Sequence, residues 1–191
     1  WCRHKSTINK IVSKKNLRKN LINLRKKNFK VVEIKNSTLE KIIIKSSLKK
    51  NQIVGAYYPI NFEIDCFEIL KKIEKIGFTI CLPVTEKKFE MNFFKWSFNE
   101  PLKIGNLGVP EPYKIKKLYP DLLFVPLVAF DKFKYRLGYG GGYYDRYIQK
   151  IKKIKKIITV GIAFSFQEVR NLPKNNYDKK LDFILIENNI K

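Results

Sequence analysis

Apolar residues recur at helical spacing in three segments of the chain. In residues 8–27 they are mostly three or four positions apart, with basic residues between them, and this pattern predicts an amphipathic helix. Residues 37–49 and 65–77 predict two further helices, because Ser37 and Asp65 each precede a glutamate by three positions, the arrangement of a capping box. Gly77 is expected to end the third helix. The apolar positions of the first helix are Ile8, Ile11, Val12, Leu17, Leu21 and Leu24.

Five short runs of β-branched, aromatic and other apolar residues alternate with these helices. They span residues 53–58, 78–82, 122–125, 157–163 and 183–186. Nearly continuous apolar strands that alternate with helices are typical of a parallel sheet covered on both faces. We therefore predict an α/β fold, a three-layer sandwich with a mostly parallel central sheet flanked by helices. Residues 1–191 are enough to bury a core, and we expect them to form a single domain.

The most distinctive motif is the segment RLGYGGGYYDRY, residues 136–147, which places four glycines within five positions between Arg136 and Arg146. Clustered glycine suits a backbone that approaches a ligand closely, and a loop that enters a helix presents free N–H groups to an anion. The motif lacks the Lys-Ser/Thr ending of a P-loop, and Tyr143 stands where a dinucleotide-binding fingerprint has its third glycine. A turn with a purely structural role is the other interpretation. The arginines, tyrosines and Asp145 favour anion binding.

The charge of the chain first suggests nucleic acid as a partner. Forty Lys and Arg against seventeen Asp and Glu give a formal net charge of +23. Only six of these cations are arginine, and the lysines are scattered along the sequence instead of forming one basic stripe. We therefore interpret most of the charge as a solvated lysine surface, and we expect small-molecule substrates and no specific nucleic acid partner.

The number and spacing of the cysteine and histidine residues argue against several kinds of site. The three cysteines, Cys2, Cys66 and Cys81, lack the number and spacing of a disulfide framework or a zinc site. The single histidine, His4, argues against a serine or cysteine triad, so the protein must act without imidazole. No apolar stretch has the length of a signal peptide core or a membrane span. We expect a cytoplasmic monomer that does not bind a membrane.

The run DLLFVPLVAFD, residues 121–131, followed by the glycine motif, resembles the signature of the 5-formyltetrahydrofolate cyclo-ligases, also called 5,10-methenyltetrahydrofolate synthetases. The resemblance extends from about Lys14 to about Glu187. Further matching segments follow in the order of the family: Lys14 with Leu17-Arg18, Tyr57-Tyr58-Pro59, Glu63-Ile64-Asp65, Leu82-Pro83-Val84, Met91 with Phe93, Gly108 to Pro112, Gly161 to Phe164, Gln167, Leu172-Pro173 and Asp178.

The resemblance implies a reaction between ATP and 5-formyltetrahydrofolate, with or without a polyglutamate tail, with Mg²⁺ as cofactor. The formyl oxygen attacks the γ-phosphate of ATP, and ring closure of the resulting iminium phosphate gives 5,10-methenyltetrahydrofolate, ADP and phosphate. Positioning and charge neutralisation are the main demands of such phosphoryl transfer. The alternatives are another ATP-dependent ligase or kinase on the same scaffold, and a basic RNA-binding protein.

The resemblance also implies a role for particular residues. Arg136 and Asp145 are the catalytic candidates, and Asp145 and Asp178 are the candidate Mg²⁺ ligands. The candidate ATP-binding residues are Lys14, Arg18, Arg136, Leu137, Gly138, Tyr139, Gly140, Gly141, Gly142, Tyr143 and Tyr144. The candidate folate-binding residues are Tyr58, Glu63, Tyr139, Gly140, Gly141, Gly142 and Tyr143. Phe93 and Trp96 are expected in the core before any role as a face for the flat rings of the substrate.

Several positions depart from the family pattern. Tyr177 precedes Asp178 where many relatives have histidine, which weakens the assignment of Asp178 to the metal. Lys134 stands at a turn position where the family usually has glycine. Gly141 stands where some members have lysine, so any cation at that point of the loop must come from Arg136 or from elsewhere in the chain.

Overall fold

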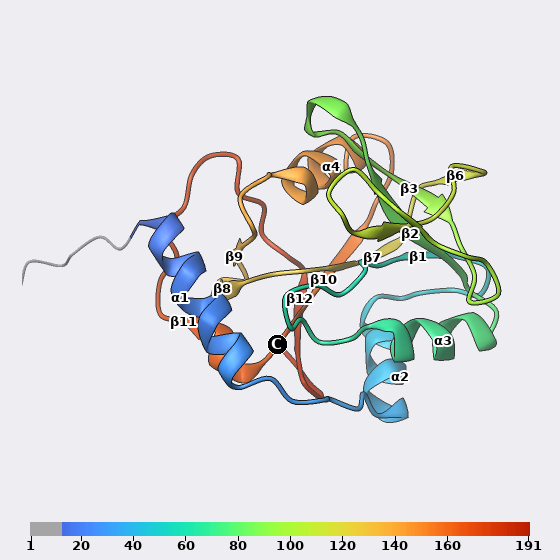
Figure 1. Ribbon diagram of the computed structural model, residues 1–191. Coiled ribbons are helices and arrows are strands. Elements are labelled where there is room, and N and C mark those ends of the chain that lie inside the picture. Colours follow the sequence, from blue (N-terminus) through green and yellow to red (C-terminus); the bar gives the residue numbers. More distant parts are fainter. Residues whose placement is uncertain (1–12) are drawn as a thin grey trace, which may run out of the picture.

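The computed structural model describes residues 13–191, and its centre is an eight-stranded sheet (Figure 1). The strands are β1 (Ile53–Gly55), β2 (Thr79–Thr85), β3 (Met91–Lys95), β6 (Lys117–Leu118), β7 (Leu122–Val125), β10 (Ile158–Ala163), β12 (Phe183–Ile186) and β13 (Asn189–Ile190). Their order is β13-β12-β10-β7-β1-β2-β3-β6. The five strands from β12 to β2 in this order pair in parallel, whereas β13, β3 and β6 pair antiparallel at the two edges.

Helices cover both faces of this sheet, which confirms the predicted α/β sandwich. These are α2 (Asn36–Lys45), α3 (Phe67–Lys75) and α4 (Tyr143–Ile151), whereas α1 (Lys14–Lys27) packs elsewhere. Alternate residues of β7 point to opposite faces: Leu122 and Phe124 pack in one core with α2 and α3, and Leu123 and Val125 pack in another with α4. In Figure 1, α2 and α3 accordingly lie below the sheet and α4 lies above it.

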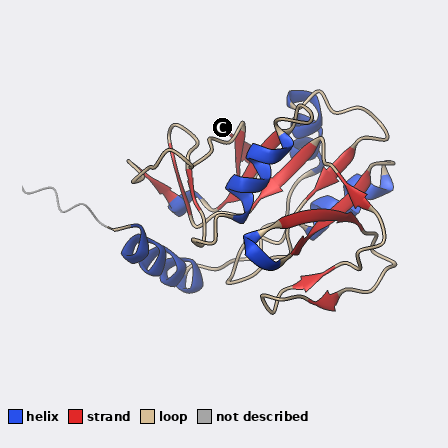
Figure 2. Ribbon diagram, turned by 90° about the horizontal axis from the view of Figure 1, so that it is seen from above, coloured by secondary structure: helices blue, strands red, loops and turns tan. Residues whose placement is uncertain are grey.

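Two smaller sheets build the surroundings of the glycine motif. One consists of β8 (Ala129–Asp131), β9 (Arg136–Leu137) and β11 (Glu168–Val169), and the other is the hairpin of β4 (Lys103–Ile104) and β5 (Pro110–Glu111). A third apolar cluster joins Leu21 of α1 to Val128, Ala129, Leu137 and Leu172. Helix α1 therefore packs on the small sheet at one end of the molecule, beside the glycine motif (Figures 1 and 2).

The helix boundaries test the predicted starts and stops. Residues 8–12 of the first predicted helix, like His4 and Cys2, lie outside the described residues. Ser13 is the N-cap of α1, and its Oγ accepts a hydrogen bond from Asn16 N at 3.3 Å. Gly77 ends the third helix as predicted, with φ +96°. At Asp65, the side chain accepts from Phe67 N at 2.8 Å, but Cys66 occupies the N-cap position, so no capping box with Glu68 forms.

The predicted capping box at Ser37 is wrong. The N-cap of α2 is Lys35, and no local side chain caps it. The helix start is held instead by Asn188, from the turn between β12 and β13. Its Oδ1 accepts hydrogen bonds from Lys35 N at 2.9 Å and from Thr38 Oγ1 at 3.1 Å. The helix also ends at Lys45, earlier than the predicted residue 49, because the chain turns at Ser47, which has φ 51°.

None of the helices in residues 13–191 has both the length and the apolar character needed to cross a bilayer.

Candidate active site

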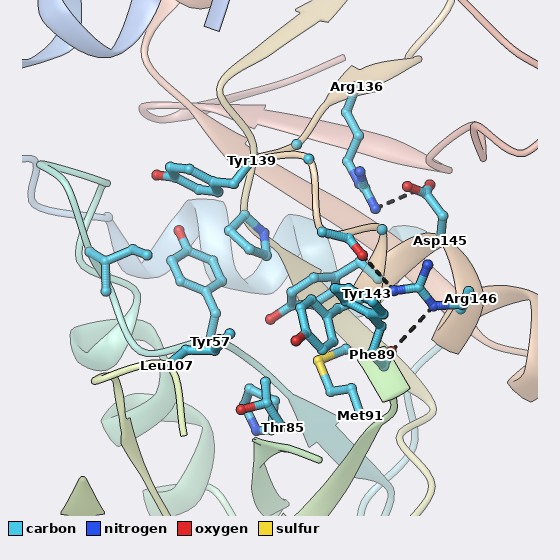
Figure 3. Close-up of a pocket in the computed structure, with 18 of the residues that line it drawn as sticks. Tyr57, Thr85, Phe89, Met91, Leu107, Arg136, Tyr139, Tyr143, Asp145 and Arg146 are labelled. Atoms are coloured by element: carbon cyan, nitrogen blue, oxygen red, sulfur yellow. Dashed lines mark hydrogen bonds and ion pairs between the residues drawn. The ribbon is translucent and has the colours of Figure 1, made fainter. Parts of the chain in front are cut away.

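A single cleft of about 880 Å³ contains all of the site residues that the sequence predicts (Figure 3). Its walls come from the glycine motif, the first half of α1, the loop after β1, the ends of β2 and β3, the β4–β5 hairpin and the loop before β12. The predicted residues along these walls are Lys14, Arg18, Tyr58, Glu63, Arg136, Leu137, Gly138, Tyr139, Gly140, Gly141, Gly142, Tyr143, Tyr144, Asp145 and Asp178.

The glycine motif forms a strand, a loop and the start of a helix. Arg136 and Leu137 belong to β9, and α4 begins at Tyr143 with Gly142 as its N-cap. Gly142 has φ +67°, and a Cβ at this position would lie 2.7 Å from Arg146 Nη1. Among the described residues no side chain caps α4, so the N–H groups of its first turn remain available beside the cleft. This arrangement suits a phosphate group.

The two catalytic candidates lie in contact with each other. Arg136 Nη2 is 3.2 Å from Asp145 Oδ1, and Lys179 N donates to the same oxygen at 3.2 Å (Figure 3). The Arg136 side chain is only 4% exposed, and its Nε has no hydrogen-bond partner among residues 13–191. Burial lowers the pKa of Arg136, and the neighbouring Asp145 carboxylate opposes this effect.

The first two turns of α1 contact two other parts of the cleft. Lys14 Nζ is 2.6 Å from Asp178 Oδ2, and Asn175 N donates to the same oxygen at 2.8 Å. One turn later, Arg18 Nε donates to Gly138 O at 2.7 Å. The helix therefore places two cations beside the glycine motif, and each of the two candidate metal ligands has a cation as its partner.

Glu63 lies in a buried polar cluster at the side of the cleft. Its Oε2 accepts from Ile60 N at 2.9 Å, and its Oε1 accepts from Tyr139 OH at 2.8 Å. The Arg25 guanidinium is 4.0 Å from Oε1. Burial raises the pKa of Glu63 to about 7, although the Ile60 amide, Arg25 and Tyr139 act in the opposite direction. The cluster thus joins Tyr139 of the glycine motif to the predicted folate contact Glu63.

The sequence of this chain is similar to those of known proteins over most of its length. Residues 10–187 match the family model described as the 5-formyltetrahydrofolate cyclo-ligase family. The chain belongs to this family. The match confirms the family predicted from the motifs, and with it an enzyme of the ligase class.

Individual cyclo-ligases agree with the family match. The chain is similar to the 5-formyltetrahydrofolate cyclo-ligase of Haemophilus influenzae, with 34% identity over 140 residues that cover 70% of this chain and 74% of that one. The Mycoplasma genitalium enzyme of the same name is 36% identical over 137 residues, 69% of this chain and 70% of its own. In structure the chain resembles the 5,10-methenyltetrahydrofolate synthetase of Aquifex aeolicus, with a TM-score of 0.70, 30% identity and coverage of 93% and 91%.

Several side chains at the cleft differ from the sequence prediction or escape it. Arg146, which the motif predicts to face an anion, lines the cleft; its guanidinium also donates to Gly141 O and, at 3.2 Å, to Phe89 O, and it lies over the rings of Phe89 and Tyr143. Apolar lining residues such as Met91 and Leu107 carry no chemical signal in the sequence. Phe93 and Trp96 lie in the core, as expected.

Arg25 is the most important residue that the sequence prediction omits, because it touches both Glu63 and Tyr139. A signal for it is present in the sequence. It is one of only six arginines, and it follows Arg18 by seven positions, which places both on one face of α1.

Proposed function

We propose that the protein converts 5-formyltetrahydrofolate to 5,10-methenyltetrahydrofolate with consumption of ATP and release of ADP and phosphate, in the presence of Mg²⁺. The main support is that a glycine loop suited to phosphate and a buried carboxylate suited to the pterin line the same cleft and are joined by Tyr139. At about 880 Å³ the cleft is near the upper end of the range of about 300–1,000 Å³ typical of small-molecule sites, as a site for two substrates requires.

The nucleotide end of the cleft would hold the triphosphate. The N–H groups of the glycine loop and of the first turn of α4 would donate to phosphate oxygens, and Lys14 and Arg18 would add positive charge from α1. Arg136, behind the loop, would neutralise part of the charge of the reacting γ-phosphate and hold Asp145 in position.

The folate end of the cleft would be organised around Glu63. Its two oxygens can accept N–H donors of the pterin in a bidentate pair, and Tyr58 and Tyr143 offer aromatic faces to the flat rings of the substrate. Tyr139 and the glycines lie between this end and the nucleotide end. They would thereby help to bring the formyl group toward the γ-phosphate.

The reaction then needs no nucleophile from the protein. The formyl oxygen forms a bond to the γ-phosphorus while the bond between the γ-phosphorus and the bridging oxygen breaks, and ADP leaves. N10 of the resulting iminium phosphate attacks the former formyl carbon, N10 loses its proton, and the C–O bond breaks to release phosphate. The protein contributes position and electrostatic stabilisation, with the two substrates held in line.

Asp145 and Asp178 fit a Mg²⁺ ion. Both are carboxylates at the cleft, and their side chains are 19% and 17% exposed. Among residues 13–191 no group of three or more His, Cys, Asp or Glu could enclose a metal. Mg²⁺ does not require such a group, because it commonly takes one or two carboxylates and completes its shell with water and substrate phosphate. When bound, Mg²⁺ would neutralise charge on the triphosphate.

The direct test mixes the purified protein with 5-formyltetrahydrofolate, ATP and Mg²⁺, and follows the absorbance of the methenyl product together with ADP release. We expect one ADP per methenyl group formed. ADP release without the methenyl product would indicate another ATP-dependent ligase or kinase. Retention of RNA in the absence of ATP and folate binding would indicate the RNA-binding alternative. The cytoplasmic location and the monomeric state stay predictions.

A further inference from the structure

Arg25 is a charged side chain sealed inside the protein. It is 1% exposed, and its three donor nitrogens contact three separate segments. Nε donates to Asn61 O at 2.9 Å, Nη1 donates to Leu127 O at 3.1 Å, and Nη2 donates to Tyr139 OH. Arg25 itself does not line the cleft. It therefore has no part in the proposed reaction as a ligand contact, and its burial needs another explanation.

The segment that Arg25 holds is a turn in an unfavourable conformation. Asn61 has φ 49° and Phe62 has φ 63°, so two consecutive residues with side chains occupy the left-handed region. The turn is closed by Glu63 N, which donates to Ile60 O at 3.0 Å, and by the return bond from Ile60 N to the Glu63 carboxylate. Such conformations persist only where surrounding contacts determine them, and they are concentrated at ligand sites.

We propose that Arg25 is a positioning residue, which fastens the Ile60–Glu63 turn and Tyr139 to the scaffold so that the Glu63 carboxylate is presented to the folate. This inference rests on the proposed function for the identity of the ligand. The Leu127 carbonyl provides the fixed point, because Leu127 is buried and lies two residues after the end of β7 in the central sheet. Through Arg25 the folate contact and the glycine motif thus share one support.

Only arginine fits this role. Its guanidinium carries five N–H donors in a rigid plane, and its three nitrogens here donate to two carbonyls and one hydroxyl. Lysine has the same charge but a single donor atom, so it can retain the attraction to Glu63 without reaching Asn61 O and Leu127 O together. A lysine variant therefore separates the effect of charge from the effect of geometry.

Arg25 also sets the charge balance around Glu63. The titratable groups that face Glu63 from the other packed elements are Tyr57, Cys66, Tyr139 and Tyr144. Burial raises the pKa of each of these groups, so all four are neutral near pH 7. Arg25 is the charged side chain among those that act on Glu63 and lowers its pKa, so its removal should raise the pKa of Glu63 above about 7.

The experiment compares Arg25→Met, Arg25→Lys and a control, Lys19→Met, on the exposed side of the same helix. Calorimetry measures the Kd for 5-formyltetrahydrofolate without ATP, and the Kd for a non-hydrolysable ATP analogue with Mg²⁺, between about pH 6 and pH 9. For Arg25→Met we expect a folate Kd about 10–100-fold higher at neutral pH, the usual effect of losing a hydrogen bond to a charged group. The loss should lessen as pH rises, because Glu63 then ionises.

The other measurements make the result specific. Arg25→Lys should weaken folate binding less than Arg25→Met and leave the pH profile near that of the parent. For the ATP analogue we expect a smaller change than for the folate in both variants, because Tyr139 is the one predicted ATP contact that Arg25 touches, and Lys19→Met should match the parent throughout. If Arg25→Met does not fold, Arg25→Lys and Tyr139→Phe carry the test, since each removes hydrogen bonds without burying an unpaired charge.

Two outcomes count against different conclusions. Equal folate Kd values in the parent and in folded Arg25 variants would overturn the positioning role and leave the proposed function standing. A parent that does not bind the folate would overturn the function. In that case hydrogen exchange still decides the positioning role: the amides of Ile60 and Glu63 should exchange faster in Arg25→Lys than in the parent, and unchanged exchange would refute it.

Discussion

The pKa of Glu63 gives a quantitative prediction for folate binding. Burial places this pKa near 7 in the free protein, whereas an ordinary glutamate titrates near 4.5. If only the carboxylate form accepts the pterin N–H groups, the apparent Kd for 5-formyltetrahydrofolate depends on the fraction of protein in which Glu63 is ionised. This fraction is about nine-tenths at pH 8 and about one-tenth at pH 6.

Folate binding should therefore weaken steadily as the solution becomes acidic. We expect the Kd to rise about tenfold between pH 8 and pH 6, and about thirtyfold by pH 5.5. A carboxylate with the ordinary pKa of 4.5 would leave the Kd almost constant over the first of these intervals. The assay is a calorimetric or fluorescence titration with 5-formyltetrahydrofolate in the absence of ATP, so that no turnover occurs.

Glu63→Gln is the matched control. It keeps the shape of the side chain and the possibility of one hydrogen bond to the pterin, but it has no proton to lose. We expect weaker binding at pH 8 and almost no pH dependence. The single histidine of the chain, His4, is unchanged in this variant. A parent Kd that stays flat down to pH 5.5, or a Glu63→Gln profile with the slope of the parent, would refute the reasoning.

Three further substitutions test other parts of the site and its frame. Asp145→Asn should lower kcat about 100-fold or more and remove the response of the rate to Mg²⁺, and chelation of Mg²⁺ from the parent should cause a similar loss of rate. An Asp145→Asn variant that Mg²⁺ still stimulates would contradict the metal assignment. Gly142→Ala places a side chain at φ +67° against Arg146 and should lower the free energy of unfolding by about 1–2 kcal/mol in urea denaturation, while the Kd for the ATP analogue increases; no change in either would disprove the need for glycine there. Lys134 has φ 65°, so Lys134→Gly should have a free energy of unfolding about 1 kcal/mol higher than Lys134→Ala. Both variants lose the same side-chain contacts, and glycine alone relieves the backbone strain, so equal stabilities would contradict this prediction.

The sequence predicts the parts of the fold that local pattern determines. The buried strands Leu122–Val125 and Phe183–Ile186 have the predicted bounds, since continuous apolar runs between helices leave few other interpretations. The antiparallel edge strands were not predicted. β13 and β6 have only two residues each, too few for any alternation of apolar and polar positions to appear.

The remaining differences come from contacts between distant segments. The N-terminus of α2 is capped by Asn188, about 150 positions later in the chain, so the local Ser37 signal gave the wrong start. Arg25 was missed for the same reason, because its partners Asn61, Leu127 and Tyr139 become neighbours only after folding. The motifs therefore supplied the residues of the cleft, whereas the residue that supports Glu63 required the structure.

The attachment of α1 has a consequence for how the protein is made. The polar partners of its N-terminal half are late in the chain: Gly138 lies 120 residues after Arg18, and Asp178 lies 164 residues after Lys14. During synthesis this helix emerges from the ribosome well before these two anchoring groups. The nascent protein must therefore complete most of its sheet before the N-terminal half of α1 can dock, and ligand binding should be acquired only late in folding.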